Sequence, residues 1–354
     1  MPRLIAVEPC FPPRYYAQAE IGREFLRVSS GRGEASREKI ERFFNSVGVS
    51  GRHLALPVEA YAGVGGFAER SEIWLANALE LGATAVEKAL GRTGLGVHEI
   101  NLFASSTVTG IAVPSLEARL MNRMRFADDC KRLPLFGLGC VAGAAGVARV
   151  SEYLRAFPTH AALLLCVELC SLTLQLSDTS IANVIAAALF GDGAACAVLV
   201  GDEHPLARSP SPRIVDTRSV LFRDSERTMG WDIVDSGFRI VLSGSVPELA
   251  RGPFARALRG FLTEHGLHPS QLSSWIAHPG GPAVIDAIEQ GLELQPGTLD
   301  ASRRCLSRVG NLSSVSVLAI AHEALHGASP PAAGHGMLFA MGPGFCAELV
   351  LLEW

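Results

Sequence analysis

One short segment of the chain places a cysteine among small residues. Residues 137–146 read GLGCVAGAAG, so Cys140 stands between glycines and directly before an alanine-rich helical pattern. A cysteine at the N-terminus of a helix lies at the positive end of the helix dipole, next to unpaired N–H groups, and this position favours the thiolate. The glycines leave room for a bulky acyl group. The segment therefore indicates a nucleophile for acyl transfer, with a buried structural cysteine in a tight turn as the alternative.

Two further glycine-lined turns carry polar residues. His278 begins HPGGP, where the proline keeps the histidine out of a helix and the glycines leave open space beside it. Asn311 lies in GNLSS, just before another helical pattern. Taken singly, His278 reads as a hydrogen-bonded loop histidine and Asn311 as a helix cap. Together with Cys140 they match the needs of thioester chemistry: a thiolate–imidazolium pair supplies the nucleophile, and imidazole and amide donate hydrogen bonds to a developing enolate oxygen.

A different chemistry is suggested by HEALH at positions 322–326. His322 and His326 are four residues apart, so on a helix both imidazoles lie on one face, and Glu323 is placed as a general base, as in zinc proteases. The nearest third ligands along the chain are His335 and Glu348. However, HEALHGASPPAAGH lacks the H-x-x-G-x-x-H continuation of one large class of zinc proteases. We therefore expect a structural helix without zinc.

The bulk properties exclude several classes of protein. With 354 residues, of which 48% are hydrophobic and 19% charged, the chain can bury a sizeable core in two domains or in one duplicated domain. A net charge of -4 gives no reason to expect nucleic acid or an anionic membrane as partner. The N-terminus does not read as a signal peptide, and polar residues and glycines interrupt the apolar stretch at 181–201. We expect a cytoplasmic protein without stable membrane insertion, in which most of the eight cysteines are buried and unpaired.

Strands alternating with helices must position these residues. Apolar runs predict buried strands at 100–104, 161–167, 194–200, 275–277 and 345–352, and helical patterns lie at 74–90, 116–125, 141–157, 254–265, 282–292 and 315–325. This alternation is typical of α/β layers around buried sheets. The stretch EHPLARSPSPR at 203–213, rich in proline, serine and charge, is the best candidate for a boundary. We therefore predict an N-terminal half at 1–205 with Cys140 and a C-terminal half at 206–354 with His278 and Asn311.

Six segments in order resemble the type III polyketide synthases, the chalcone synthase-like branch of the thiolase superfamily. They are GLGCVAGAAG around Cys140, LFGDGAAC at 189–196, GWDIVDSGFRIVLS at 230–243, HPGGPAVID at 278–286, GNLSS at 310–314 and MGPGF at 341–345. The resemblance runs nearly end to end and implies a five-layered αβαβα thiolase fold of two similar halves, in a homodimer. It also implies that Cys140 carries the starter and the growing chain, that His278 and Asn311 drive malonyl-CoA decarboxylation, and that no cofactor is needed.

The same resemblance assigns residues to the substrate pocket. Phe190 matches a gatekeeper phenylalanine, although an ordinary core aromatic is the alternative. Ile240 stands where the family has a second gatekeeper phenylalanine and should open the cavity, and Trp231 replaces a glycine of the plant enzymes. Val108 stands where plant enzymes have a threonine, and Pro343 lies in MGPGF. Glu168 and Ser313 match the hydroxyl network that is linked to aldol-type ring closure. That network looks incomplete, with Thr107 and Thr109 flanking the gap.

Matches for CoA binding are fewer. Lys39 and Arg42 match basic residues that meet the CoA phosphates, although a solvated helix face is the alternative, and Ala283 matches a further CoA contact. A third basic position of the family is Ser46 here, so the basic patch is thinner.

The function implied is iterative decarboxylative condensation of malonyl-CoA onto an acyl starter, followed by ring closure. The segment ERTMGWDIVDSGFRIVLS looks most like bacterial alkylpyrone and alkylresorcinol synthases, which place medium or long acyl starters in an apolar tunnel. Two alternatives stay open. One is a ketoacyl synthase III-like enzyme that stops after one condensation, against which the intact MGPGF segment and Trp231 argue. The other is a non-catalytic acyl-binding partner, which would normally lack part of the triad of Cys140, His278 and Asn311.

Overall fold

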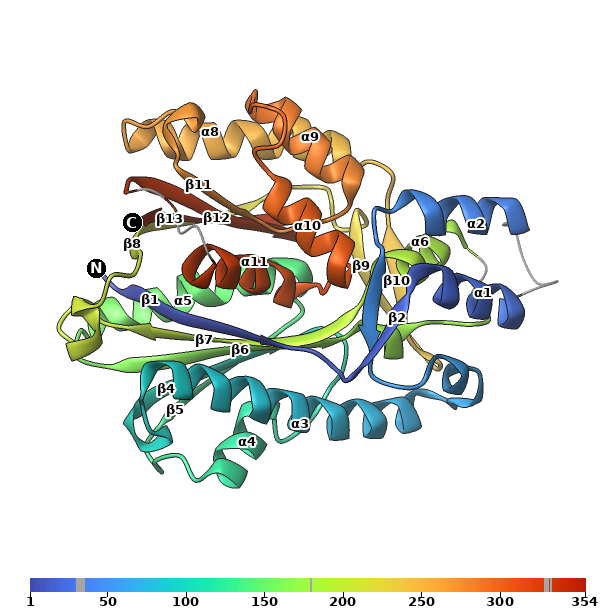
Figure 1. The fold of residues 1–354 in the computed structure, drawn as a ribbon, viewed down its shortest axis with the longest axis horizontal. Helices are drawn as coiled ribbons and strands as arrows, with labels where there is room; N and C mark the ends of the chain where they lie inside the picture. Colours follow the sequence, from blue (N-terminus) through green and yellow to red (C-terminus); the bar gives the residue numbers. More distant parts are fainter. Residues whose placement is uncertain (30–35, 179, 328–330, 332) are drawn as a thin grey trace.

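The computed structural model describes residues 1–29, 36–178, 180–327, 331 and 333–354. Its helices and sheets stack in five layers in the order helix, sheet, helix, sheet, helix (Figure 1), so the expected αβαβα arrangement is confirmed. The strands are β1 (Arg3–Cys10), β2 (Arg14–Ala17), β3 (Gly51–Leu54), β4 (Ile100–Thr107), β5 (Lys131–Phe136), β6 (Ala161–Leu169), β7 (Asp192–Val200), β8 (Arg213–Leu221), β9 (Met229–Val234), β10 (Gly237–Leu242), β11 (Ser274–Ala277), β12 (His335–Gly342) and β13 (Cys346–Glu353). The helices are α1 (Gln18–Ser29), α2 (Arg37–Ser46), α3 (Phe67–Thr93), α4 (Leu116–Met124), α5 (Ala142–Ala156), α6 (Ile181–Leu189), α7 (Val246–Leu249), α8 (Ala255–Glu264), α9 (Pro282–Leu292), α10 (Asp300–Val309) and α11 (Ser314–His326).

The main sheet has nine strands in the order β11-β12-β13-β8-β1-β7-β6-β4-β5. Its two parts meet where Arg3 of β1 pairs with Arg213 of β8. Figure 1 shows these parts on opposite sides of α5 and α11, while α3 and α4 cover one outer face and α8 and α9 cover the other. The helices α5 and α11 are therefore enclosed between two layers of strands.

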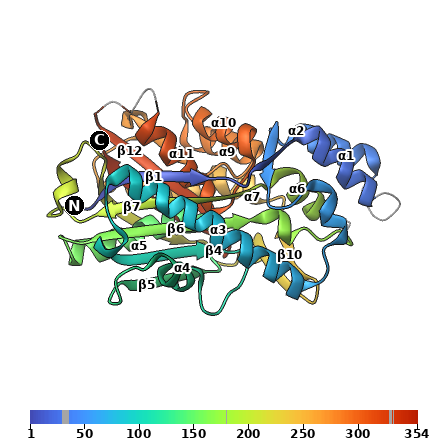
Figure 2. The same cartoon turned by 60° about the horizontal axis from the view of Figure 1, so that its bottom comes forward.

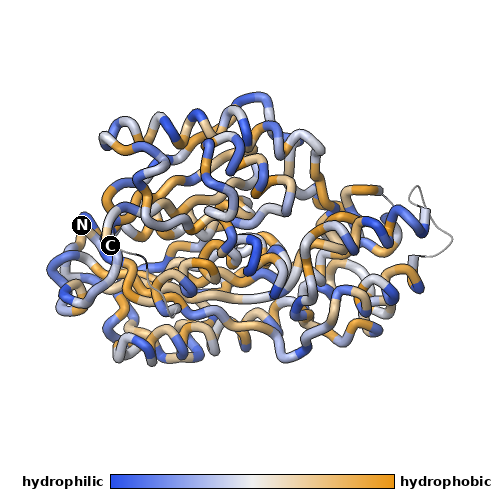
Figure 3. The backbone as a smooth tube through the Cα atoms, turned by 45° about the horizontal axis from the view of Figure 1, so that its top comes forward, coloured by the Kyte–Doolittle hydropathy of each residue, from blue (hydrophilic) through white to orange (hydrophobic). Residues whose placement is uncertain are grey.

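Small residues bring the two central helices together. A Cβ atom added at Gly143, near the start of α5, would lie 2.3 Å from the carbonyl oxygen of Ser314 at the start of α11. Every residue of β6 and β7 is buried, because helices cover both faces of the sheet. Figure 3 shows apolar segments gathered in this interior. The beginnings of α5 and α11 are thus held against each other inside the core.

The apolar runs located strands and helices correctly where the chain is buried. The strands predicted from them are observed as β4, β6, β7, β11 and β13, although β13 begins after Phe345, which lies in a turn. The predicted helices are observed as α3, α4, α5, α8, α9 and α11. The apolar stretch at 181–201 divides into α6 and β7, and none of the described helices is long and apolar enough to cross a membrane.

Strand β8 was missed because charged residues interrupt its apolar ones. The strand β8 reads RIVDTRSVL and pairs with β13 along most of its length. Figures 1 and 2 place α1, α2 and α6 at the end of the molecule opposite to both chain termini. The segment 203–213 lies between β7 and β8 and includes a short turn of helix at Pro205–Arg208. The division into halves at 205/206 stays a prediction.

Candidate active site

One cavity brings together the three residues singled out in the sequence. It is lined by Cys140, His278 and Asn311. Each comes from a different segment: Cys140 from the turn before α5, His278 from the loop after β11, and Asn311 from the loop before α11. Of the residues assigned to the substrate pocket, all but Glu168 also line this cavity: Val108, Phe190, Trp231, Ile240, Ser313 and Pro343. The arrangement is that of a covalent acyl-transfer site, and the individual roles stay predictions.

Cys140 lies in a short 3₁₀ turn, Gly139–Val141, that leads into α5. Gly139 has a φ of 56°, and a Cβ there would lie 2.8 Å from Pro343, so this turn requires glycine. The sulfur lies 3.6 Å from the hydroxyl of Ser313. Burial raises the pKa of the Cys140 thiol to about 12, an effect that the Ser313 hydrogen bond only partly opposes. Burial therefore outweighs the preference for the thiolate that is expected from the start of the helix.

His278 is held by its backbone, whose N–H donates to the carbonyl oxygen of Phe339 at 3.0 Å. The residue is 5% exposed, and its Nδ1 is buried without a hydrogen-bond partner among the described residues. Burial lowers the pKa of His278 to about 3. Burial thus disfavours both the thiolate and the imidazolium, and the ion pair needs direct contact between them or the arrival of substrate.

Asn311 is positioned by backbone bonds to α6 and the turn after it. Its N–H donates to the Leu189 carbonyl at 2.8 Å, and its carbonyl accepts from the N–H of Gly191 at 3.0 Å. Its side-chain Oδ1 accepts from the backbone N–H of Ser313 at 2.8 Å. Helix α11 begins at Ser314 and its N-cap position is Ser313, so Asn311 does not serve as the N-cap. The Nδ2 group is left to donate to a ligand in the cavity.

The hydroxyl network around Glu168 differs from the one expected. Glu168 is fully buried and accepts hydrogen bonds from the backbone N–H of Val108, the hydroxyl of Thr109 and the hydroxyl of Ser314, the last at 2.6 Å. Ser313, the expected partner, bonds to Cys140 instead. Burial raises the pKa of Glu168 to about 7. The network therefore runs through Thr109 and Ser314, and Thr109 carries it to the cavity wall.

The sequence indicated Thr109 only as a neighbour of Val108, where the hydroxyl of the family's threonine is missing. Nothing in the sequence indicated that Ser314 bonds to Glu168. Adjacent residues of an extended segment face opposite sides of it. The hydroxyl of Thr109 can therefore reach Glu168 in place of a threonine at position 108 only if the backbone turns between the two positions. The turn after β4 does this for Thr109.

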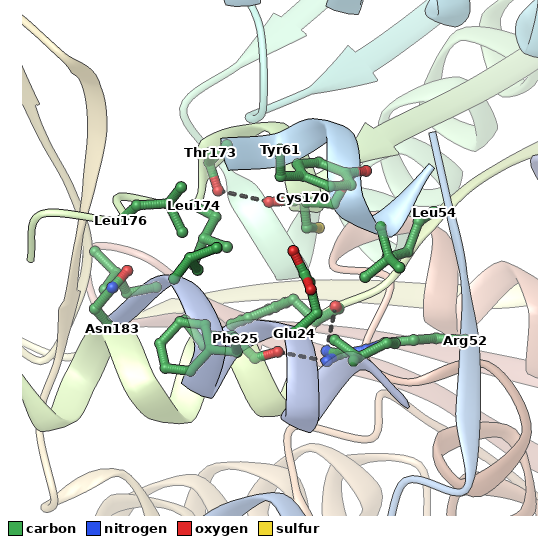
Figure 4. A pocket seen from close by; sticks show the side chains of 18 of the residues that line it. Glu24, Phe25, Arg52, Leu54, Tyr61, Cys170, Thr173, Leu174, Leu176 and Asn183 are labelled. Carbon is green, nitrogen blue, oxygen red and sulfur yellow. Dashed lines mark hydrogen bonds between the residues drawn. The ribbon is translucent and has the colours of Figure 1, made fainter. Parts of the chain in front are cut away.

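A second, mainly apolar chamber adjoins this cavity (Figure 4). Four residues line both: Cys170, Phe190, Trp231 and Ile240. Trp231 and Ile240 are cross-strand partners in the β9–β10 hairpin, so one hairpin supplies much of the wall between the two spaces. Figure 4 shows that the far side carries apolar side chains from α1, β3 and the segment before α6, among them Phe25, Leu54, Leu174 and Leu176. The resemblance implied an apolar tunnel, but the sequence did not indicate which residues line this chamber, because they come from segments far apart in the chain.

Of the three residues matched to CoA binding, Ala283 lines the cavity. Lys39 and Arg42 are exposed on α2 and do not line the cavity, and Arg42 stacks over the ring of Phe43 at 5.9 Å. Val47, which directly follows α2, does line it, as does the exposed Ala283 at the start of α9. The two basic residues lie on the helix that leads to Val47, and their contact with CoA phosphates stays a prediction.

The HEALH segment forms the last turns of α11 and has a structural role. His322 Nδ1 donates to the carbonyl oxygen of Val7 at 2.6 Å, and His326 Nε2 accepts from the N–H of Val7 at 3.4 Å. These bonds satisfy the backbone of β1 on the side where β8 pairs with it only at Arg3. An unpaired strand edge is thereby closed by two imidazoles.

Glu8 is the third group that approaches these histidines, not His335 or Glu348. In the described part of the chain Glu8, His322 and His326 form the one cluster able to hold a metal ion, with ligand atoms within 4.8 Å of one another. Glu8 also pairs with Arg92. Because Val7 and Arg92 already engage these groups, we keep the prediction that the helix is structural.

We expect that enzyme treated with a chelator and dialysed keeps full activity and that elemental analysis finds no stoichiometric zinc. Substituting His322→Gln should lower the free energy of unfolding by about 1 kcal/mol, since one backbone carbonyl loses its present partner. Thermal unfolding and product assays check both points. One tightly bound zinc per chain, lost in this variant, would restore the metal hypothesis.

Comparisons with known proteins agree along the whole chain. Residues 2–204 match the family described as chalcone and stilbene synthases, N-terminal domain, and residues 214–353 match the C-terminal domain of the same family. A 1,3,6,8-tetrahydroxynaphthalene synthase of Streptomyces peucetius subsp. caesius is 46% identical over 349 residues, covering 99% of this chain and 92% of the relative. A putative chalcone synthase of Bacillus subtilis (strain 168) is 34% identical, covering 97% and 96% of the two chains.

A solved structure shares the arrangement in space. The 1,3,6,8-tetrahydroxynaphthalene synthase of Streptomyces coelicolor A3(2), described as a bacterial type III polyketide synthase, superimposes with a TM-score of 0.93 at 28% identity, covering 99% of both chains.

Proposed function

Because the chain belongs to the chalcone and stilbene synthase family and is a type III polyketide synthase, we propose that Cys140, His278 and Asn311 carry out its condensations. The observation that supports this most directly is that all three line one cavity, with the Asn311 amide oriented by Ser313. Neither a metal nor another cofactor is required in this scheme. The extender is malonyl-CoA, and the starter is an acyl-CoA or malonyl-CoA itself.

Each round of the reaction has two bond exchanges. The Cys140 sulfur attacks the starter thioester, CoA leaves, and His278 takes up the thiol proton. Malonyl-CoA then loses its carboxylate as CO2, and His278 and the Asn311 amide donate hydrogen bonds to the resulting enolate oxygen. The enolate carbon attacks the Cys140 thioester, the sulfur leaves, and the chain, now longer, is held by CoA. Its return to Cys140 starts the next round.

We propose a tetrahydroxynaphthalene-type product made from malonyl-CoA alone as the first candidate. Its support is the relative named for that product, which is 46% identical over nearly the full length. The cavity offers Thr109, bonded to the buried Glu168, as a polar group close to a folded polyketide. Its hydroxyl proton is donated to Glu168, so Thr109 marks a polar point on the cavity wall and does not itself hold a carbonyl oxygen.

An alkylpyrone or alkylresorcinol made from a medium or long acyl starter is the second candidate. The apolar chamber beyond Trp231 and Ile240 favours it, since a hydrocarbon chain needs a dry, apolar space that adjoins the nucleophile. Ile240 leaves more room at this wall than the phenylalanine of relatives.

Mass spectrometry of products separates the candidates. Incubation with malonyl-CoA alone should give a tetrahydroxynaphthalene, and addition of acyl-CoAs of increasing length tests for alkylated pyrones and resorcinols. A single β-ketoacyl product would instead indicate a ketoacyl synthase III-like enzyme, and no product at all would support an acyl-binding partner. The same assay with acyl groups on a carrier protein tests the starter's source.

We further propose a cytoplasmic homodimer. All eight cysteines are free, which suits a reducing compartment. Strand β5 ends the main sheet, and Ile111, Val113 and Phe136 are exposed at 43%, 89% and 52%. An open strand edge beside exposed apolar side chains favours self-association. Light scattering after size-exclusion chromatography gives the mass directly.

Substituting Trp231→Ala is expected to change which chains the enzyme accepts while leaving acylation of Cys140 intact. Removing an indole from the wall joins the cavity to the second chamber. Each further buried methylene contributes about 0.8 kcal/mol, or roughly fourfold in kcat/KM, until the space is filled. The length limit for acyl-CoA starters or the number of extensions should therefore shift.

Trp354→Ala is the matched control, because this indole donates to Ser274 on β11 and lines neither space. An identical product spectrum for Trp231→Ala and the unmutated enzyme would remove Trp231 from the substrate wall.

A further inference from the structure

Ser313 has an unusual backbone for a residue with a side chain. Its φ is 51° and its ψ is -125°. These angles belong to the first central position of a type II′ turn, where glycine dominates because a Cβ is strained there. Non-glycine residues in such conformations concentrate at functional sites, where the surroundings hold them in place. Ser313 is 3% exposed and lines the cavity.

This backbone orients the amide of Asn311. The N–H of Ser313 donates to Asn311 Oδ1 at 2.8 Å, which determines which end of the carboxamide faces the cavity. With the carboxamide reversed, an oxygen would face the developing enolate and repel it. The backbone of Ser313 thus selects the productive orientation.

The side chain of the same residue reaches the nucleophile. Its Oγ lies 3.6 Å from Cys140 Sγ, and a hydroxyl accepts from a thiol but donates to a thiolate. Ser313 is free for this contact because the neighbouring Ser314 takes the bond to Glu168. One serine therefore touches the nucleophile through its side chain and the amide through its backbone.

We propose that Ser313 is a positioning residue, which orients the Asn311 amide through its strained backbone and places the Cys140 sulfur and stabilises its thiolate through its hydroxyl. The proposal rests on the roles proposed above for Cys140 and Asn311. The backbone of Ser313 acts on Asn311 and its hydroxyl acts on Cys140, so a substitution that removes only the hydroxyl tests the second contribution alone.

Ser313→Ala removes only the hydroxyl. Alkylation of Cys140 by iodoacetamide should become about tenfold slower at a fixed pH near 8, and its pH profile should move up by roughly one unit, since a thiolate loses a charge-assisted hydrogen bond. Malonyl-CoA decarboxylation, followed as acetyl-CoA release, should stay within about threefold, because the Ser313 N–H still orients Asn311.

Ser313→Gly removes the hydroxyl and the strain together. Its melting temperature should be no lower than that of Ser313→Ala, because glycine adopts the positive φ without a Cβ. Decarboxylation should stay within about threefold in this variant too, since glycine keeps both the N–H and the turn that orient the Asn311 carboxamide. Ser151→Ala is the matched control: it also loses one buried hydroxyl, from the middle of α5, where Oγ donates to Ala148. It should behave as the unmutated enzyme in both assays.

An unchanged alkylation profile in Ser313→Ala would overturn the contact with Cys140. A tenfold or larger loss of decarboxylation in Ser313→Gly, which keeps the backbone donor, would overturn the orientation of Asn311 by this backbone. Failure of the proposed function appears elsewhere: the unmutated enzyme itself would then release no acetyl-CoA, and both proposals would fall.

Discussion

Substituting Cys140→Ala is expected to abolish polyketide synthesis and the formation of an acyl-enzyme. The sulfur is the atom that holds the starter and every intermediate chain, and no other group can replace it at the start of α5. The variant should still fold, because one small side chain replaces another in a turn whose shape depends on Gly139. Intact-protein mass spectrometry after incubation with acyl-CoA, together with product analysis, measures both losses.

Cys166→Ala is the matched control for this experiment. Cys166 is fully buried in β6, away from the cavity lining, and burial raises its thiol pKa well above the ordinary value. Cys130 and Cys170 are likewise expected to be dispensable for acylation, although Cys170 lines both cavities and its loss can alter the products. Polyketide synthesis near the unmutated rate in Cys140→Ala would contradict the proposed mechanism at its centre.

Substituting Asn311→Ala or His278→Ala is expected to slow malonyl-CoA decarboxylation on the order of 100- to 1000-fold. Each residue donates a hydrogen bond to an oxygen that becomes negative only as CO2 leaves, so the contribution is largest near the transition state. Starter loading on Cys140 should suffer much less in Asn311→Ala. Single-turnover assays of loading and of acetyl-CoA release measure the two steps separately.

Asn101→Ala serves as control, since its Oδ1 accepts from the backbone of Ala161 outside the cavity. Equal losses of loading and decarboxylation in Asn311→Ala would indicate a disturbed loop instead of a missing donor. The pH profile adds a check on His278. Because burial lowers its pKa to about 3, protonation of His278 should not reduce decarboxylation between about pH 7 and pH 5.

The sequence by itself determined the family and the layered fold, and it singled out three residues that share one cavity. Cys140, His278 and Asn311 stand in glycine-lined turns, and such local features are written in neighbouring residues. Buried strands such as β6 could also be predicted from the sequence, because a strand covered on both faces is mostly apolar along its length.

The tertiary structure alone decided which neighbours each group meets. Ser313 and Ser314 are adjacent, yet one contacts Cys140 and the other Glu168, because the positive φ of Ser313 turns the chain between them. The pKa values of Cys140 and His278 likewise depend on burial by distant segments. For Cys140, this burial outweighs the preference for the thiolate expected from the start of the helix. The role of HEALH was hidden in the same way, since its partners Val7 and Glu8 lie on a strand at the other end of the chain. Local sequence records the conformation of a segment, whereas contacts between remote segments arise only when the layers pack.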